Sequence, residues 1–160
     1  MKITINTKEL LTATQSVVGV VEKKQTMPIL GHILFEMKKN KAFLTATDLE
    51  VQIKSYAKLE TEATSEFSFT VSGRKLYDII RSLNDETVDL QIKNEKLNIT
   101  TKKSKYKLAT MSPQEFPVFD DKKAQDSLNI GQTELLEIIA KTQFAMAQQD
   151  VRFYLNGLLL

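Results

Sequence analysis

The hydrophobic and polar positions of this chain predict the same order of elements twice. In the first part, Ile3 and Ile5 alternate with polar residues as in a strand, and apolar residues then recur at helical spacing from Leu10 to Val21. Asn6, followed three residues later by Glu9, resembles a capping box at the helix start. Three strand-like runs follow, at 29–37, 41–46 and 50–56. The pattern predicts a strand, a helix and three strands.

The order recurs in the next part of the chain. A strand-like alternation at 67–71 precedes a helical pattern at 76–83. Strands are then predicted near 87–93, 96–101 and 104–110, and Asn94 and Glu95 form a tight hairpin turn between the first two. Because each half has to bury one sheet face under its single helix, we expect an α+β domain of two similar halves, with the helices on one face of antiparallel sheets.

A longer repeat begins further along. Sliding the sequence on itself by 125 positions places Ile5, Glu9, Leu10, Leu11 and Leu30 on Ile130, Glu134, Leu135, Leu136 and Leu155. A period of this size favours tandem globular domains. Residues 112–126, with two prolines and a charged run, have the composition of a linker. We expect a complete first domain at 1–124 and an incomplete second one at 125–160, made of strand, helix and strand, which frays or docks on a neighbouring molecule.

Composition narrows the class of protein. With 42% hydrophobic and 26% charged residues, the 160-residue chain is typical of a globular protein that is long enough for one domain with a core. Its apolar runs are too short to span a membrane and its N-terminus lacks a secretory signal, so we expect a cytoplasmic protein without membrane partners. The sequence has no cysteine, which excludes disulfides, thiolate metal sites and cysteine catalysis.

The formal net charge of +2 hides an uneven distribution. Residues 71–108 carry nine Lys/Arg against five Asp/Glu, whereas residues 42–70 carry two against five. The polar faces of the three predicted helices include Lys8, Thr12, Gln15, Ser16, Gly19 and Lys23, then Arg74, Lys75, Asp78, Arg81 and Ser82, and finally Thr133, Glu137, Lys141 and Gln148. Such faces can follow a phosphate backbone, or they can be ordinary solvated faces without a partner.

The residues offer little material for catalysis. His32, the only histidine, lies in an apolar strand-like run and is expected to be structural. Asp48 and Glu50 can bind a divalent metal or act as a general acid/base pair, but a turn cap and a solvent-facing residue explain them better. The sequence contains no glycine-rich phosphate loop, GxSxG or HExxH motif. We predict a protein that is not an enzyme and needs no metal or cofactor.

The segment 102–108 alternates lysines with other residues, among them Tyr106 and Leu108. Lysines on a strand commonly protect a sheet edge from unwanted pairing. An edge with one apolar face can instead pair with a chosen partner. Both interpretations stay open from the sequence.

Four motifs resemble one known family. MPILG at 27–31, TDLE at 47–50, EFP at 115–117 and QDVRFYLNG at 149–157 occur in the order and at the spacings of the bacterial DNA polymerase III beta subunit, the sliding clamp. The resemblance covers the whole chain. It implies the DNA clamp fold, in which three similar domains per subunit form a head-to-tail dimeric ring, with helices lining the hole around duplex DNA and sheets on the outside.

The resemblance also implies residue roles. It places residues near the DNA backbone at Lys24, Arg74, Gln149, Arg152, Phe153 and Tyr154, although Phe153 lacks the hydroxyl that relatives often carry there. It places the subunit interface at Lys75, Lys96, Lys103, Lys105, Tyr106 and Leu108. Arg152 and Leu155 match the start of the pocket that receives short clamp-binding peptides of polymerases, clamp loaders and repair proteins.

Two other functions remain open at this point. The chain can be a stand-alone basic module that binds nucleic acid, or a metal-dependent nuclease centred on Asp48 and Glu50. Under the clamp interpretation it supplies the first domain and the opening of the second, and we expect that it cannot close a ring by itself. The clamp interpretation makes it a processivity factor, with any polymerase or nucleotidyltransferase activity belonging to the holoenzyme.

Overall fold

The structure is a computed structural model that describes residues 2–21, 27–60, 65–119 and 127–159. The chain divides into two compact units, 1–120 and 121–160, which are considered separately below. The boundary at residue 120 lies inside the predicted linker at 112–126. The first unit therefore ends four residues before the predicted domain boundary at 124.

The first unit contains the predicted order twice. Its first half consists of β1 Lys2–Asn6, α1 Thr7–Val18, β2 His32–Lys38, β3 Lys41–Thr47 and β4 Gln52–Lys58. Its second half consists of β5 Phe67–Ser72, α2 Gly73–Ser82, β6 Thr87–Lys93, β7 Lys96–Thr100 and β8 Lys105–Met111. Strand, helix and three strands are confirmed in both halves.

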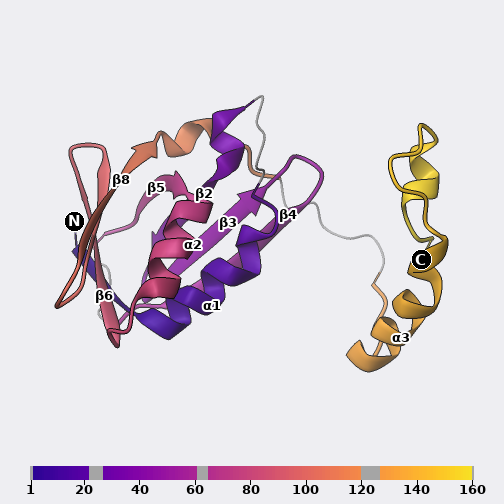
Figure 1. Cartoon of the computed structure of the whole chain (residues 1–160), viewed down its shortest axis with the longest axis horizontal. Coiled ribbons are helices and arrows are strands. Elements are labelled where there is room, and N and C mark those ends of the chain that lie inside the picture. The colour runs from indigo at the N-terminus through magenta and orange to yellow at the C-terminus, as the bar shows by residue number, and fades with distance from the viewer. Residues whose placement is uncertain (1, 22–26, 61–64, 120–126, 160) are drawn as a thin grey trace. The chain divides into compact units, whose positions relative to one another are not determined.

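The strands form one antiparallel sheet in the order β1-β6-β7-β8-β5-β2-β3-β4. The sheet curls until its two end strands meet, because Ile5 of β1 forms an isolated bridge with Leu59, just after β4. The backbone N–H of Glu60 also donates to the carbonyl of Thr4 at 3.0 Å. Helices α1 and α2 contact each other and lie on one face of this sheet (Figure 1).

The core lies between the two helices and the concave face of the sheet. Leu10 and Val17 of α1 and Leu76 of α2 are fully buried there. Phe35 and Phe69, on the paired strands β2 and β5, stack with ring centroids 4.9 Å apart. The helical periodicity of the apolar residues therefore corresponds to a buried face on each helix of the first unit.

Two predicted boundaries were wrong in the first half. Residues 29–31 do not begin a strand; they belong to the 3₁₀ helix η1 Pro28–Gly31, whose fixed proline φ suits a first helical position. Helix α1 ends at Val18 and not at Val21, and Gly19 follows it. Val21 is nevertheless buried, so the apolar pattern outlasts the helix.

The predicted linker is not wholly a linker. Its first part forms η2 Pro113–Glu115, and Phe116 is 5% exposed. Phe116 packs in a second small cluster with Ile29, Leu30 and Leu34. Two of the family-like motifs, around Leu30 and Phe116, therefore meet in one apolar cluster.

The hairpin prediction is confirmed. Asn94 and Glu95 join β6 to β7, and both have positive φ, 51° and 54°. Two successive left-handed residues give the turn whose twist matches the flanking strands.

The second unit contains α3 Gln132–Thr142 and the short 3₁₀ helices η3 Gln143–Ala145 and η4 Phe153–Asn156. The predicted helix is confirmed, but the strands predicted around Leu128 and after the helix are wrong for the described residues 127–159, which form no strand. A strand is stable when a neighbour satisfies its backbone groups, and this unit has no sheet among its described residues. None of its described residues is buried. Among the described residues of the whole chain, no helix is long and apolar enough to cross a membrane.

Candidate nucleic-acid interface

The exposed face of α1 is mostly uncharged. Asn6 caps this helix, because its side-chain oxygen accepts from the backbone N–H of Lys8 at 3.0 Å. The hydroxyls of Thr12 and Ser16 donate to backbone carbonyls one turn earlier, at 3.0 and 2.9 Å. Thr12, Gln15, Ser16 and Gly19 are exposed, with Lys8 at the N-terminal end. The middle of the face carries small and neutral polar groups.

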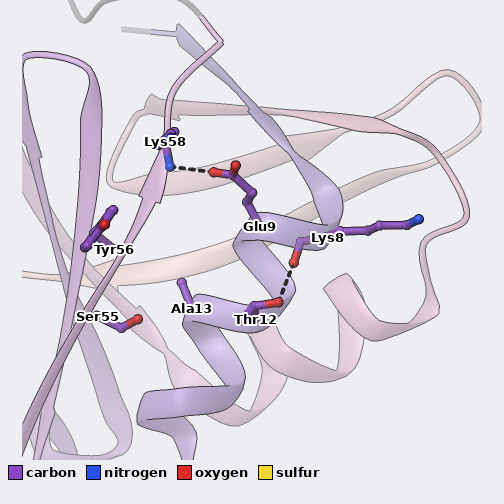
Figure 2. A pocket seen from close by; sticks show the side chains of 7 residues that line it. All are labelled: Lys8, Glu9, Thr12, Ala13, Ser55, Tyr56 and Lys58. Carbon is purple, nitrogen blue, oxygen red and sulfur yellow. Dashed lines mark hydrogen bonds between the residues drawn. The ribbon is translucent and has the colours of Figure 1, made fainter.

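The Glu9 half of the predicted capping box is not formed. The Glu9 carboxylate instead accepts from the backbone N–H of Lys58 at 2.8 Å. A groove of about 370 Å³ lies at this contact, between α1 and β4 (Figure 2). Lys8, Tyr56 and Lys58 also line this groove, and the Lys8 side chain extends away from Glu9 (Figure 2).

The exposed face of α2 is more strongly charged. It presents Arg74, Lys75, Asp78, Arg81 and Ser82, as predicted. The Arg74 guanidinium donates to the carbonyl of Val21 at 2.9 Å, which ties the start of α2 to the segment after α1. Arg81 lies 4.0 Å from Asp78 and over the ring of Tyr77. Both helix faces are on the side of the sheet that carries the helices, so the structure brings their polar residues to one surface.

In the second unit, Asp150 organises the loop that contains the last family-like motif. Its backbone N–H and carbonyl bond the Asn156 side chain, each at 3.0 Å. Its carboxylate accepts from the Arg152 backbone N–H at 2.8 Å and from the guanidinium at 3.0 Å through both oxygens. These hydrogen bonds from Arg152 lower the pKa of the Asp150 carboxyl. The loop from Asp150 to Asn156 is therefore held closed by hydrogen bonds between its own polar groups.

The aromatic side chains of this loop are exposed to solvent. Phe153 is 83% exposed and Tyr154 is 76% exposed, and Leu155 is partly exposed. Gln149 is exposed with a positive φ of 58°. Exposed rings beside an arginine suit contacts to sugar and base surfaces. Of the residues predicted to lie near DNA, Arg74 is in the first unit, these loop residues are in the second, and Lys24 lies outside the described residues.

The residues predicted at a subunit interface lie on three elements of the first unit. Lys96 is on β7, Lys105, Tyr106 and Leu108 are on β8, and Lys75 is on α2, while Lys103 lies in the turn before β8. Tyr106 and Leu108 are half-buried and pack against the core. Strand β8 pairs with β7 from Lys105 to Ala109 and with β5 only at Thr110 and Met111. Its earlier residues therefore face β7 on one side and an open edge on the other.

The candidate catalytic residues form structural contacts. Asp48 accepts from the backbone N–H groups of Val51 at 2.7 Å and Glu50 at 3.0 Å, and the bond from Val51 is the main cause that lowers the pKa of its carboxyl. Asp48 is a turn cap, as expected. His32 shares a 3.0 Å hydrogen bond with Thr70, and burial together with the charge of Lys75 lowers its pKa. Within the described ranges, no three His, Cys, Asp or Glu residues gather to hold a metal ion.

Sequence reasoning missed the supporting residues of the site. It placed Arg152 in the loop but not Asp150 and Asn156, which fix the loop through five hydrogen bonds. A signal was available, because aspartate and asparagine residues bond nearby backbone groups in turns and both lie inside the motif 149–157. The tie from Arg74 to Val21 had no such signal, since the two residues are far apart in sequence.

Comparison with known proteins gives a consistent result. Residues 1–120 match the family model of the DNA polymerase III beta subunit, N-terminal domain. The chain is 40% identical over 161 aligned residues to the beta sliding clamp of Pseudomonas putida, covering 100% of this chain and 44% of that protein. The chain therefore spans less than half the length of the curated relatives it matches.

Solved structures agree with the sequence comparison. The DNA polymerase III subunit beta of Pseudomonas aeruginosa superimposes with a TM-score of 0.89 at 39% identity, covering 98% of this chain and 43% of that chain. The beta clamp of Helicobacter pylori, solved with a DNA ligase peptide bound, superimposes with a TM-score of 0.85 at 30% identity, covering 95% of this chain and 42% of that one. These matches extend over both compact units.

Proposed function

Because this chain belongs to the DNA polymerase III beta subunit family, whose N-terminal domain it matches over residues 1–120, we propose that it forms part of a DNA sliding clamp. Such a clamp is a ring that encircles duplex DNA and keeps the replicative polymerase on its template. The chain then contributes binding and no catalysis, as a processivity factor, and it acts in the bacterial cytoplasm where the chromosome is copied.

The observation that carries this proposal is the shared surface of α1 and α2. A ring that holds DNA by encircling it does not need tight phosphate contacts, and it has to slide. The hydroxyl and amide groups in the middle of α1 interact weakly with phosphates, and the described cations of these faces are Lys8 at the N-terminal end of α1 and Arg74, Lys75 and Arg81 on α2. This distribution supports a surface that faces DNA without gripping it.

Individual contacts follow from the same proposal. We assign Arg74 and Lys24 to the DNA backbone in the first domain, and Gln149, Arg152, Phe153 and Tyr154 to a contacting loop in the second. Arg74 is already positioned by the Val21 carbonyl. Arg152 is oriented by Asp150, so the loop keeps its shape when its rings are in solvent.

The protein partners are also part of the proposal. The open edge of β8, with Lys96, Lys103, Lys105 and the half-buried Tyr106 and Leu108, supports a head-to-tail homodimer in which this surface and Lys75 meet an acidic neighbour. Arg152 and Leu155 supply part of a pocket for short peptides of the polymerase, the clamp loader and repair proteins. The ligase peptide bound by the Helicobacter pylori clamp is the kind of ligand we expect for the whole protein.

A chimera tests the ring. It replaces the matching N-terminal part of the Pseudomonas putida clamp with this chain, and the parent clamp is the control. We expect a dimer in light scattering that a clamp loader places on nicked circular DNA and that leaves when the DNA is cut to a linear form. Retention of the dimeric chimera on the cut DNA would contradict encirclement and favour the stand-alone binding module. The 160-residue chain alone should bind circular and linear duplex equally.

A further inference from the structure

The convex face of the sheet carries an aromatic and basic patch that the proposed function does not use. Strand alternation turns Ala42, Leu44 and Ala57 toward the core, where they are buried. The intervening residues of β2, β3 and β4 face away from the helices, which lie in front of these strands in Figure 1. We call this set the outer patch: Glu36, Lys38, Lys41, Phe43, Lys54 and Tyr56.

Two aromatic rings form the centre of the outer patch. Phe43 and Tyr56 are directly opposite each other on β3 and β4. Their ring centroids are 6.1 Å apart with the planes tilted by 52°. Tyr56 is 50% exposed, although a ring of that size is an expensive group to leave in water. Phe43 is half-buried beside it, so the pair offers the exposed Tyr56 ring and the accessible part of the Phe43 ring as surfaces on which planar groups can stack.

Each ring has its own ammonium group. The Lys41 Nζ lies 4.0 Å from the Tyr56 ring centroid, and the Lys54 Nζ lies 5.3 Å from the Phe43 centroid. Lys38 is paired with Lys41 across β2 and β3. The outer patch therefore combines two rings with three lysines, and Lys58, opposite Lys41 in the register, adds a fourth cation beside it.

The only carboxylate of the outer patch is held by its lysines. Glu36 lies 3.0 Å from the Lys38 Nζ and 3.4 Å from the Lys54 Nζ. Partial burial raises the pKa of Glu36, but the hydrogen bonds and charges of Lys38 and Lys54 outweigh it and leave the pKa lowered. The net charge of the patch is positive, although the segment 42–70 is acidic in sequence, because Lys38 and Lys54 both lie at Glu36 and Lys41 lies over the Tyr56 ring.

We propose that the outer patch binds single-stranded nucleic acid, with bases stacking on Phe43 and Tyr56 and phosphates on Lys38, Lys41 and Lys54. Each nucleotide has one base and one phosphate, and each ring of the patch has one adjacent cation. A duplex hides its base faces, and a polypeptide of aspartate and glutamate has no aromatic ring to stack on Phe43 and Tyr56. The proposal goes beyond the clamp function and does not depend on it, because the patch is on the opposite side of the sheet from α1 and α2.

Fluorescence anisotropy of the 160-residue chain with a labelled oligothymidylate of about 12 nucleotides tests the proposal. We expect tighter binding to this strand than to an abasic strand of equal length or to polyglutamate. Replacing Tyr56 by alanine should weaken binding at least about five-fold and remove the preference over the abasic strand, because base stacking on one aromatic ring is worth this much or more. Lys54→Ala should reduce the salt dependence by about 0.7 in slope, and the exposed Lys102→Ala is the matched charge control.

Equal affinity for the abasic strand or for polyglutamate would overturn the proposal, and so would an unchanged affinity in Tyr56→Ala. Thermal unfolding checks that each variant is folded. A measurement that needs no variant is photocross-linking of the wild-type chain to a single strand that carries 5-iodouracil. The cross-link should form at Phe43 or Tyr56. Cross-links confined to α1, α2 or the loop 149–157 would contradict the assignment. Duplex binding through the helix face should be unchanged in Tyr56→Ala, which separates this proposal from the clamp function.

Discussion

Helices α1 and α3 are counterparts in the 125-residue register, yet they end up in different environments. Leu10 of α1 is fully buried and Leu11 is half-buried, whereas their counterparts Leu135 and Leu136 are partly buried and 59% exposed. No described residue of α3 is buried. A similar apolar stripe thus forms a helix in both units, but it becomes a core only where a sheet covers it.

The sharpest test of this difference truncates the same leucine in both helices. We expect Leu10→Ala to lower the free energy of unfolding of the first unit by about 2–5 kcal/mol, because it leaves a cavity in a packed core. Its counterpart Leu135→Ala should change that free energy by no more than about 0.5 kcal/mol. Urea unfolding followed by circular dichroism measures both. A similar loss in both variants would show that α3 is part of the same packed core.

Gly73 in the first unit and Gly157 in the second give another comparison, with a smaller expected change in stability. A Cβ at Gly73, the first residue of α2, would lie 2.9 Å from both the Ile33 Cγ1 and the Val21 Cγ2. Since Ile33 and Val21 are buried, Gly73→Ala should destabilise the first unit by about 1–3 kcal/mol through overpacking. At Gly157 a Cβ meets nothing within 4 Å, so Gly157→Ala should leave thermal unfolding unchanged. A neutral Gly73→Ala would mean that the α1–α2 junction can relax.

A comparison of Asp89 in the first unit with Asp150 in the second gives the smallest expected change in unfolding free energy, and this change depends on pH. Asp89 on β6 accepts from the Thr4 hydroxyl at 2.7 Å and lies 2.8 Å from the Lys2 Nζ on β1. Partial burial raises the pKa of Asp89, but these partners on β1 outweigh it and leave the pKa lowered. Asp89→Asn should therefore cost about 1 kcal/mol of unfolding free energy at neutral pH.

The sign of the pH dependence follows from that lowered pKa. The Asp89 contribution is present above the unfolded pKa of about 3.9 and is lost as the pH falls through the lower folded value. Urea midpoints of wild type and Asp89→Asn should thus converge on acidification. Asp150→Asn is the control, because Asp150 belongs to the exposed loop of the second unit and should not affect unfolding of the first. A constant difference at all pH values would assign the effect to packing and not to charge.

Local patterns predicted the parts of the fold that depend on neighbours in sequence. The helices followed from apolar spacing, and the hairpin at Asn94 and Glu95 followed from turn chemistry. The prediction failed at Ile29 and Leu30, whose apolar side chains suit a strand as well as the 3₁₀ helix that Pro28 begins. It also failed near Leu128, where an apolar residue without a paired neighbour does not form a strand.

The candidate site also has parts that the sequence predicts and parts that depend on the three-dimensional structure. Exposure of Thr12, Gln15 and Arg81 could be predicted, since helical periodicity alone decides which residues face away from the core. The outer patch could not, because its charge and its ring pair depend on the register between β2, β3 and β4. The family-like motifs indicated Arg152 and Leu155, but the bonds that shape their loop became visible only in the structure.

The contact from Glu9 to the Lys58 N–H also affects how the domain behaves when many copies are crowded together. Strand β4 is the last strand in the sheet order, and the bridge from Leu59 to Ile5 meets β1 just after β4 ends, so the residues of β4 before Leu59 form a partly open edge, a feature that can recruit another copy and start aggregation. An arriving strand would have to displace the Glu9 carboxylate before it could pair at Lys58. The Glu9 carboxylate on α1 therefore occupies one of the backbone groups at which such pairing could begin.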